Sequence, residues 1–450
     1  MPVGTSGPPT LKGWPLLGNL FEFSRDRLAL FQRVYRELGE LGRVRVVNRN
    51  VFVATSPELA EALLRREAAS FKKFAALARF ATPVIGNGIL ASEGDLHRRQ
   101  RRIIAPGLAK NRIAQYVAAM ARHTDEAVTR WGRAGRIDVI ADMTRLTMAI
   151  ASETMFNSSA SAYADVATTA VHEAMHYIAS EVGRPIHVPI TWPTPRNRRL
   201  LRALAPLDRV VFDMIRERRA SGQRPDDILS MLLDGKHEDD GAGMTDQQVR
   251  DEVMTLFVAG HETTSNALSW SLYLLARHPD IAARLADECR AVLGGRAPTF
   301  AELERLPYAR AVFLETMRLY PPAYIVGREC VTPVSLAGFP VAPGDMVVLN
   351  IYGLHHRADL FPDPERFDPD RFAGDKEKAL PRGAFIPFAD GPRVCAGGHF
   401  AMLEGQVVLA HIAQHLRFTP YAGPPIPAIS RVTLRPRDAF TLQVTASSAG

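Results

Sequence analysis

Apolar residues recur every three to four positions along most of the chain, which predicts a mainly helical protein. Shorter runs alternate apolar and polar positions, as strands with one buried face do. The clearest alternating pair is 43–47 and 51–55, a predicted hairpin with its turn at 48–50. Helical patterns are expected at 26–38, 57–66, 95–108, across 112–222, and at 245–277, 307–320 and 400–416.

Other segments break the helical pattern. Residues 71–95 contain prolines and glycines and are predicted to be rich in loops, and prolines at 185–195 divide the helices of 112–222 into two groups. Strands are expected at 331–336 and 346–349, and a further hairpin over 431–445. The predicted fold class is therefore mainly α with small β-sheets, an α+β arrangement.

The most unusual helix is the one predicted from Thr245 to Arg277. Thr245 and Gln248 have the spacing of a capping box, and the helix would be roughly 48 Å long at 1.5 Å per residue. Its middle, 253–260, is almost entirely apolar and should be buried. Polar residues follow directly, in the string AGHETT at 259–264. Polar side chains are not expected at the centre of a buried helix unless they have a specific role.

Composition limits the class of protein. The chain has 450 residues, 46% hydrophobic and 23% charged, without repeats or a long linker, so one compact domain over 1–450 is expected, with a Pro/Gly-rich leader at 1–25. Three cysteines are too few for a disulfide framework or zinc cluster and favour a reducing compartment. The first residues lack a long apolar run, so a cytoplasmic protein without a membrane anchor is predicted.

The net charge of +7 makes nucleic acid a partner to consider, but no nucleic-acid-binding motif accompanies it. The basic residues instead cluster at 97–102 and at 196–199. For 196–199 an ordinary solvated face is the favoured interpretation. A local positive face suits an acidic protein partner or acidic groups on a cofactor.

Cys395 stands just before a predicted helix, in the string FADGPRVCAGG. Unpaired N–H groups and the helix dipole favour a thiolate there, the form of cysteine that binds metals. Glycines beside it let a flat ligand approach the backbone. For a lone cysteine the alternative is a buried, inert thiol.

The surrounding pattern resembles the haem-binding loop of the cytochrome P450 family, which has Phe, Gly, Arg, Cys and Gly at the offsets of Phe388, Gly391, Arg393, Cys395 and Gly397. The resemblance implies a triangular, helix-rich fold with haem b (Fe-protoporphyrin IX) between the long central helix and the cysteine-loop helix. Cys395 would be the iron ligand, with Phe388 and Gly397 beside the cofactor.

Five further cofactor-binding residues are implied by the same resemblance. His97 and Arg101, one helical turn apart, match a pair that bonds a haem propionate in soluble bacterial members, although by spacing alone they could form a solvated basic face. Arg328 and Arg393 occupy positions of further propionate-binding arginines. Ala259 begins the family's Ala/Gly-Gly-x-Asp/Glu-Thr motif on the central helix.

Within that motif Thr263 would hold dioxygen and its water, and Glu262 would supply protons. A hydroxyl beside a carboxyl is a relay suited to the two protons that cleavage of the O–O bond needs. Without the resemblance, Thr263 and Thr264 would be expected to bond carbonyls one turn back. His261 is assigned no role.

A structural network is implied by the family's Glu-x-x-Arg motif, which matches Glu315 and Arg318, and by PERF at 364–367. Arg366 would complete a buried network with the first two residues. Spacing alone would suggest a surface ion pair of little energetic value.

The resemblance implies a monooxygenase that inserts one atom of O2 into an apolar substrate, by hydroxylation or epoxidation. Fatty acids, terpenoids, steroids and polyketide-like molecules are all open. A peroxygenase or peroxide-rearranging enzyme should lack Glu262 and Thr263, and a haem sensor should have a second axial ligand. A monomer is expected, without a fused reductase, that receives electrons from a ferredoxin with its reductase, or a flavodoxin, near Arg98, Arg99 and Arg102.

Overall fold

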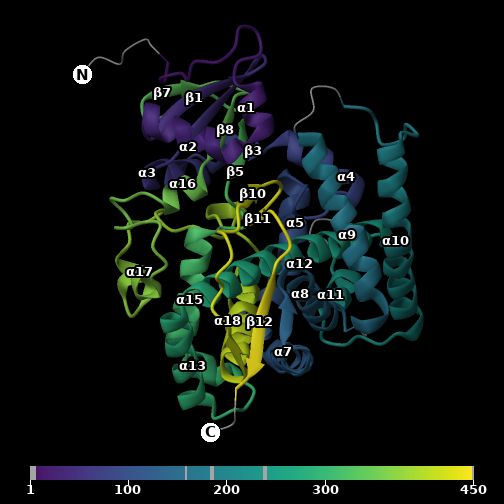
Figure 1. Ribbon diagram of the computed structural model, residues 1–450. Coiled ribbons are helices and arrows are strands. Elements are labelled where there is room, and N and C mark those ends of the chain that lie inside the picture. The colour runs from purple at the N-terminus through teal and green to yellow at the C-terminus, as the bar shows by residue number, and fades with distance from the viewer. Residues whose placement is uncertain (1–6, 158–159, 183–186, 237–240, 448–450) are drawn as a thin grey trace.

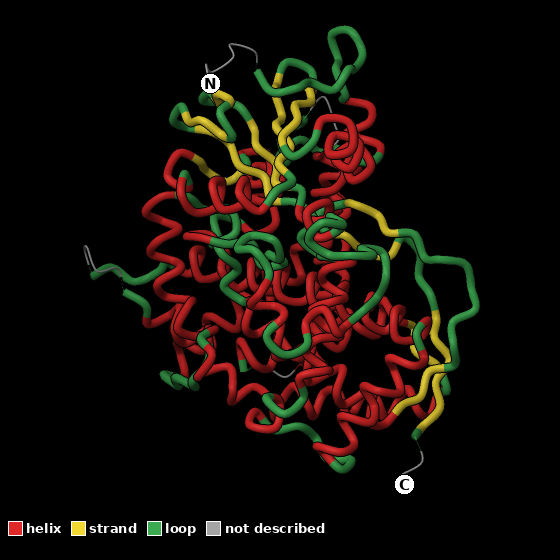
Figure 2. The backbone as a smooth tube through the Cα atoms, turned by 90° about the vertical axis from the view of Figure 1, so that its left-hand side faces the viewer, coloured by secondary structure: helices red, strands yellow, loops and turns green. Residues whose placement is uncertain are grey.

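The computed structural model describes residues 7–157, 160–182, 187–236 and 241–447. Strands β1, β3, β5, β7 and β8 gather in a lobe with the N-terminal segment, whereas helices form most of the rest, with β10 and β11 near the centre and β12 near the C-terminus (Figure 1). The same division is visible from the side, where most strands lie at the top and the helices form the bulk (Figure 2). The α+β prediction is confirmed.

The α-helices of the described residues are α1 (Leu20–Arg25), α2 (Arg27–Leu38), α3 (Pro57–Glu61), α4 (Ala75–Ile85), α5 (Gly94–Ile104), α6 (Lys110–Ile113), α7 (Val117–Ala134), α8 (Val139–Phe156), α9 (Ala160–Val182), α10 (Pro195–Ser221), α11 (Ile228–Asp234), α12 (Asp246–Arg277), α13 (Pro279–Leu293), α14 (Phe300–Leu303), α15 (Pro307–Leu319), α16 (Ile351–His355), α17 (Lys376–Ala379) and α18 (Gly398–His415).

The strands form one five-stranded sheet, in the order β1-β2-β8-β5-β3, and three smaller sheets: β10-β11, β4-β12-β9 and β6-β7. Their bounds are β1 (Leu41–Val46), β2 (Arg49–Ala54), β3 (Phe71–Lys73), β4 (Arg136–Asp138), β5 (Val326–Cys330), β6 (Val334–Leu336), β7 (Phe339–Val341), β8 (Met346–Leu349), β9 (Leu416–Phe418), β10 (Ala428–Ser430), β11 (Leu434–Pro436) and β12 (Thr441–Ala446).

Helix α12 is the predicted central helix, and both of its predicted ends are confirmed. Thr245 and Gln248 form the capping box, and the helix ends at Arg277. It packs against α8, α15 and α18. The approach of α15 to α18 depends on Gly405, where a Cβ would lie 2.4 Å from the ring of Phe313. Helix α12, which carries the polar string at 259–264, is therefore packed in one core with the cysteine helix α18.

Several predicted boundaries and elements were wrong. The segment 71–95 contains strand β3 and helix α4, not only loops, and the turn between β1 and β2 is at 47–48. Residues 431–445 do not form one hairpin, because β11 pairs with β10 whereas β12 pairs with β4 and β9. The segment 331–336 provides only β6, since β5 ends at Cys330.

Within the described ranges, no helix combines the length and the apolar character needed to cross a bilayer. The break predicted at 185–195 lies between α9 and α10, and its first two residues, 185 and 186, are outside the described part. The start of α10 is fixed by Thr194, whose hydroxyl accepts a hydrogen bond from the Asn197 N–H at 3.2 Å.

Candidate active site

The cysteine loop precedes α18 and is closed by the backbone. The N–H of Cys395 donates to the carbonyl of Phe388 at 3.0 Å. Gly391 has a φ of +74°, and a Cβ there would lie 1.8 Å from the carbonyl oxygen of Leu64, so a side chain cannot be accommodated. A Cβ at Gly398 would lie 3.3 Å from the Phe388 ring. The glycines thus allow the loop to pack tightly.

The Cys395 thiol is accessible to solvent and also close to many protein atoms. The residue is exposed by its accessible surface, yet burial among surrounding protein atoms raises the pKa of the thiol. A hydrogen bond from the Gly397 N–H and the charge of Arg101 act in the opposite direction on that pKa. A coordinated metal ion deprotonates a thiol outright. Cys289, by contrast, is fully buried and its pKa is raised to about 12, as expected of an inert thiol.

Helix α5 brings His97 and Arg101 to the cysteine loop. The Arg101 guanidinium donates to the carbonyl of Val394, the residue before Cys395, at 2.7 Å. His97 is buried, and burial, followed by the charge of Lys73, lowers its pKa to about 4. The His97 imidazole is therefore neutral at pH 7, one helical turn from the Arg101 guanidinium on α5.

Two more predicted arginines lie close by. Arg393 donates to the Glu93 carboxylate at 2.7 Å and to the carbonyl of Phe71 at 3.1 Å. Arg328 is buried on β5 and donates to the carbonyl of Gly327, and burial, followed by the charge of Arg393, lowers its pKa to about 10. No carboxylate of the described residues forms an ion pair with Arg328.

Lys73 is a member of this cluster that sequence reasoning missed. Its ammonium donates to the carbonyls of Ile89 and Ser92, each at 2.8 Å, and burial lowers its pKa to about 8. No pattern in the sequence indicates the role, because its neighbours Arg328 and Arg393 come from distant segments.

The donor set fits the anionic edge of a haem. Lys73, Arg101, Arg328 and Arg393 are four cations, and Glu93 is the carboxylate bonded within the group. Buried cations without partners are costly, and each opposes the charged form of the next. Two carboxylates beside the cysteine loop would compensate this excess charge.

On the central helix, Glu262 is held from a distant loop. The Thr433 hydroxyl donates to one Glu262 carboxyl oxygen at 2.7 Å and accepts from the Asn266 amide at 3.1 Å. The other carboxyl oxygen is buried without a partner among the described residues. Burial raises the Glu262 pKa to about 7, although Thr433 and the charge of Arg435 lower it. Thr433 has no sequence signal of its own.

The neighbouring side chains bond within the helix. The Thr263 hydroxyl donates to the carbonyl of Ala259 at 2.8 Å, the arrangement expected of a threonine without another partner. The His261 ring bonds the carbonyl of Phe257 at 2.8 Å, and burial lowers its pKa to about 4. Glu262 is thus the residue of this string that can donate a proton near neutral pH.

The Glu-x-x-Arg pair is fully buried, but its third member differs from the prediction. Arg318 donates to Glu315 at 2.7 and 2.9 Å. Arg371 lies 3.4 Å from Glu315, whereas Arg366 supplies its carbonyl oxygen to Arg318 at 3.1 Å and its side chain is exposed. The reason is a repeat in the sequence: Arg-Phe occurs at 366–367 and again at 371–372, where the cation faces inward.

Comparison with known proteins adds independent evidence. The family model described as Cytochrome P450 matches residues 8–443. Cyclooctat-9-en-7-ol 5-monooxygenase of Streptomyces melanosporofaciens is 36% identical, over 94% of this chain and 93% of its own. Cyclooctatin synthase of the same organism is 35% identical over 96% and 92%, and pentalenene oxygenase of Streptomyces avermitilis 29% over 97% and 96%.

These matches span nearly the whole described chain, and the cysteine loop, the cation cluster and the carboxyl-bearing central helix all lie inside the matched range. The family binds haem and its members are oxidoreductases. The chain therefore belongs to the cytochrome P450 family and is a monooxygenase.

Proposed function

We propose that this protein is a haem b monooxygenase that hydroxylates an apolar terpenoid. Two features together support it most. The cysteine loop is accessible, and the central helix α12 carries Glu262, whose pKa is about 7 and whose second carboxyl oxygen has no hydrogen-bond partner among the described residues. The substrate class rests on the relatives, whose names specify cyclooctat-9-en-7-ol and pentalenene. Fatty acids and steroids are the competing substrates.

Cys395 would ligate the iron, and His97, Arg101, Arg328 and Arg393 would hold the propionates, with Lys73 as a further cation. Bound haem supplies the iron that activates O2 and oxidises a C–H bond, and a thiolate ligand favours O–O cleavage. The chain would contribute a fixed, positively charged site for the propionates, which would favour one orientation of the cofactor.

Proton delivery would fall to Glu262 and Thr263. A carboxyl with a pKa of about 7 has both its acid and its base forms at neutral pH, which suits a group that donates and is reprotonated. Thr433 fixes one oxygen of that carboxyl, so the other remains for a proton acceptor. Thr263 would exchange its bond to Ala259 for one to dioxygen or water.

Electrons would come from a separate protein, a ferredoxin or flavodoxin. Arg98 and Arg102 are exposed on α5, the helix that also contacts the cysteine loop. An acidic carrier docked there would be near the haem edge. We also propose that the described residues act as one monomeric haem domain.

The absorption spectrum of the ferrous CO complex tests the ligand. The strongly red-shifted Soret band of thiolate ligation is expected for the wild type, and Cys395→Ser should lose it, whereas Cys330→Ser should retain it. A normal band in Cys395→Ser would exclude this proposal. Substrate-induced spectral shifts with terpenoids, fatty acids and steroids then separate the substrate classes.

A peroxygenase remains the second candidate, and Glu262 and Thr263 count against it. The test is turnover with H2O2 alone compared with turnover by O2, NADPH and a reconstituted redox partner. Faster product formation with H2O2 would favour the peroxygenase.

A further inference from the structure

An apolar tip is formed by Trp14, Leu16, Leu17, Phe21 and Val47 at the outer end of the strand-rich lobe. Nine large apolar side chains are exposed among the described residues, and these five are the only ones of them that come from the first 50 positions. Their exposed fractions range from 37% for Leu17 to 86% for Leu16. Apolar residues gathered in this way on a surface mark an interaction site.

The backbone holds the tip rigidly. Trp14 and Gly18 exchange two hydrogen bonds of 2.9 and 2.8 Å, and the Val47 N–H donates to the carbonyl of Leu17 at 3.2 Å. Gly18 lies so close to β1 that a Cβ would be 2.1 Å from the Arg45 carbonyl oxygen. The backbone of the apolar tip is therefore held in place by hydrogen bonds, both within the tip and to the turn after β1.

Two of its apolar residues have strained backbones. Leu16 has a φ of +65° and Val47 a φ of +58°, a region that is unfavourable for any side chain and most of all for a β-branched one. At Val47 the positive φ belongs to the two-residue turn between β1 and β2. Leu16 lies outside that turn, and its side chain is 86% exposed, so packing does not compensate its strain. Presentation of the Leu16 side chain to a partner would explain that strain.

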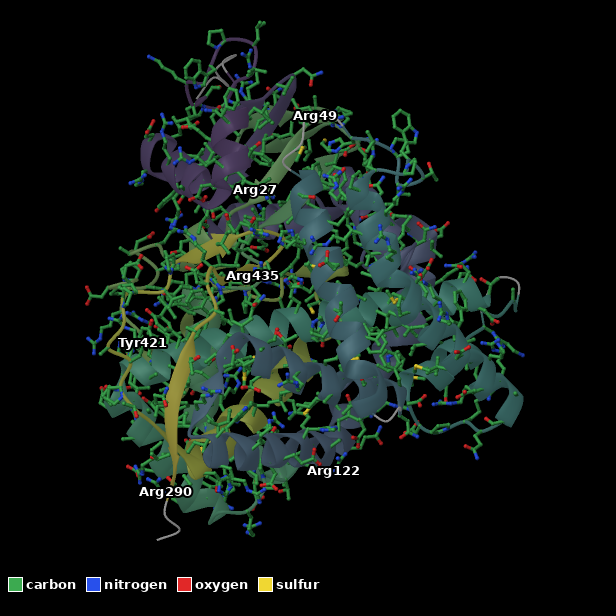
Figure 3. The ribbon with its side chains drawn as sticks, turned by 45° about the vertical axis from the view of Figure 1, so that its right-hand side comes forward. Arg27, Arg49, Arg122, Arg290, Tyr421 and Arg435 are labelled. Carbon is green, nitrogen blue, oxygen red and sulfur yellow. The ribbon has the colours of Figure 1, made fainter. Side chains whose placement is uncertain are left out.

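The charges around the tip identify the partner. Lys12, Arg45 and Arg49 are exposed, and no carboxylate of the described residues forms an ion pair with any of them. Figure 3 shows Arg49 on this lobe. Trp, Leu and Phe with a rim of Lys and Arg are the composition of segments that lie in the interface of an anionic bilayer. A protein partner would need an apolar patch surrounded by carboxylates in the matching arrangement, whereas the surface of an anionic bilayer supplies both features everywhere.

We propose that the apolar tip binds peripherally to the surface of an anionic lipid bilayer, with the side chains of Leu16 and Phe21 inserted and Lys12, Arg45 and Arg49 on the headgroups. The contact would place the strand-rich lobe against a membrane, where apolar molecules concentrate. It concerns a surface remote from the Glu262 string and does not depend on the substrate proposed above.

Co-sedimentation of the haem-loaded protein with vesicles tests it. Vesicles of phosphatidylglycerol and phosphatidylcholine should bind the wild type, and Leu16→Ser/Phe21→Ser should reduce the partition coefficient at least tenfold. The matched control is Leu201→Ser/Val331→Ser, which removes two exposed apolar side chains elsewhere and should leave binding unchanged. Arg45→Gln/Arg49→Gln should weaken binding severalfold and reduce its dependence on salt.

Failure of the wild type to bind anionic vesicles would overturn the proposal, as would equal binding by Leu16→Ser/Phe21→Ser. Sedimentation velocity without lipid covers the other occupants: self-association that the tip variant abolishes would identify a second copy of the chain instead. Far-ultraviolet circular dichroism and the haem spectrum verify that each variant is folded.

Discussion

Lys73 and Arg328 lie directly opposite each other in the antiparallel strands β3 and β5. Two cations in facing positions destabilise a sheet, and here burial adds to the cost by disfavouring both charged forms. The arrangement becomes favourable when anions bind between the strands and the cysteine loop. The repulsion between these two residues is therefore the most direct support for the proposed propionate site.

The first prediction concerns Arg328→Met. Haem affinity should fall roughly tenfold or more, because a charge-assisted hydrogen bond is lost, while the apoprotein should become more stable by about 1 kcal/mol because a buried, unpaired cation is removed. Haem transfer to apomyoglobin and urea unfolding of the apoprotein measure the two effects. A decrease in both haem affinity and apoprotein stability, or an increase in both, would contradict the assignment of Arg328 to the propionates.

The second prediction concerns Arg371, whose role the sequence assigned to Arg366. Arg371→Met removes a cation 3.4 Å from the buried Glu315 and should lower the free energy of unfolding by about 2 kcal/mol. Arg366→Met is the matched control, since its side chain is exposed and it contributes a carbonyl that any residue retains. Urea unfolding of both variants decides between the two arginines.

The difference between these two arginines shows what the sequence can predict. Local signals were reliable: the Thr245–Gln248 capping box and the end of α12 follow from neighbouring residues. Partners that come from far along the chain were not predictable, as with β12, which pairs with β4 about 300 residues earlier. Lys73 and Thr433 were missed for the same reason, since their roles exist only once distant segments are packed together.

The third prediction is a pH dependence. In Glu262 the folded-state pKa is raised to about 7 from 4.5, so the folded protein binds more protons than the unfolded chain between these values. Stability should therefore decrease as the pH rises from about 4.5 to about 7, and Glu262→Gln should remove a cost that reaches about 3 kcal/mol above pH 7. Urea unfolding of both proteins at pH 5 and pH 8 measures it: their difference should be larger at pH 8.

The fourth prediction concerns Thr263→Ala. Haem content and substrate-induced spectral shifts should be unchanged, because the hydroxyl bonds only the Ala259 carbonyl within its own helix. Hydrogen peroxide should account for most of the electrons consumed in place of product. Thr255→Ala removes a similar bond, to Asp251 at 2.7 Å, two turns earlier on α12, and is the control. Equal coupling of electron use to product in wild type and Thr263→Ala would exclude the relay.

The last prediction concerns the connection between α4 and α5, which is pinned to α12 by two carboxylates. Asp251 accepts from the Asn87 N–H at 2.9 Å, and Glu252 accepts from the Ile89 N–H at 3.0 Å. A Cβ at Gly88 would lie 2.6 Å from the Asp251 carbonyl oxygen, which is fixed in the helix. The close approach of the two segments thus requires glycine at 88.

Gly88→Ala should displace this connection from α12 and break the hydrogen bonds that the Asn87 and Ile89 N–H groups donate to Asp251 and Glu252. Amide hydrogen exchange at 86–93 should become faster by tenfold or more, since the loss of both carboxylate bonds exposes these N–H groups to water. Gly243→Ala is the control, because its Cβ would meet the nearest atom at an ordinary 3.9 Å. Substrate titrations of the same two variants test whether the connection belongs to the substrate pocket. If it does, the substrate dissociation constant should rise in Gly88→Ala and not in Gly243→Ala. Faster exchange with an unchanged dissociation constant would place the connection outside the pocket.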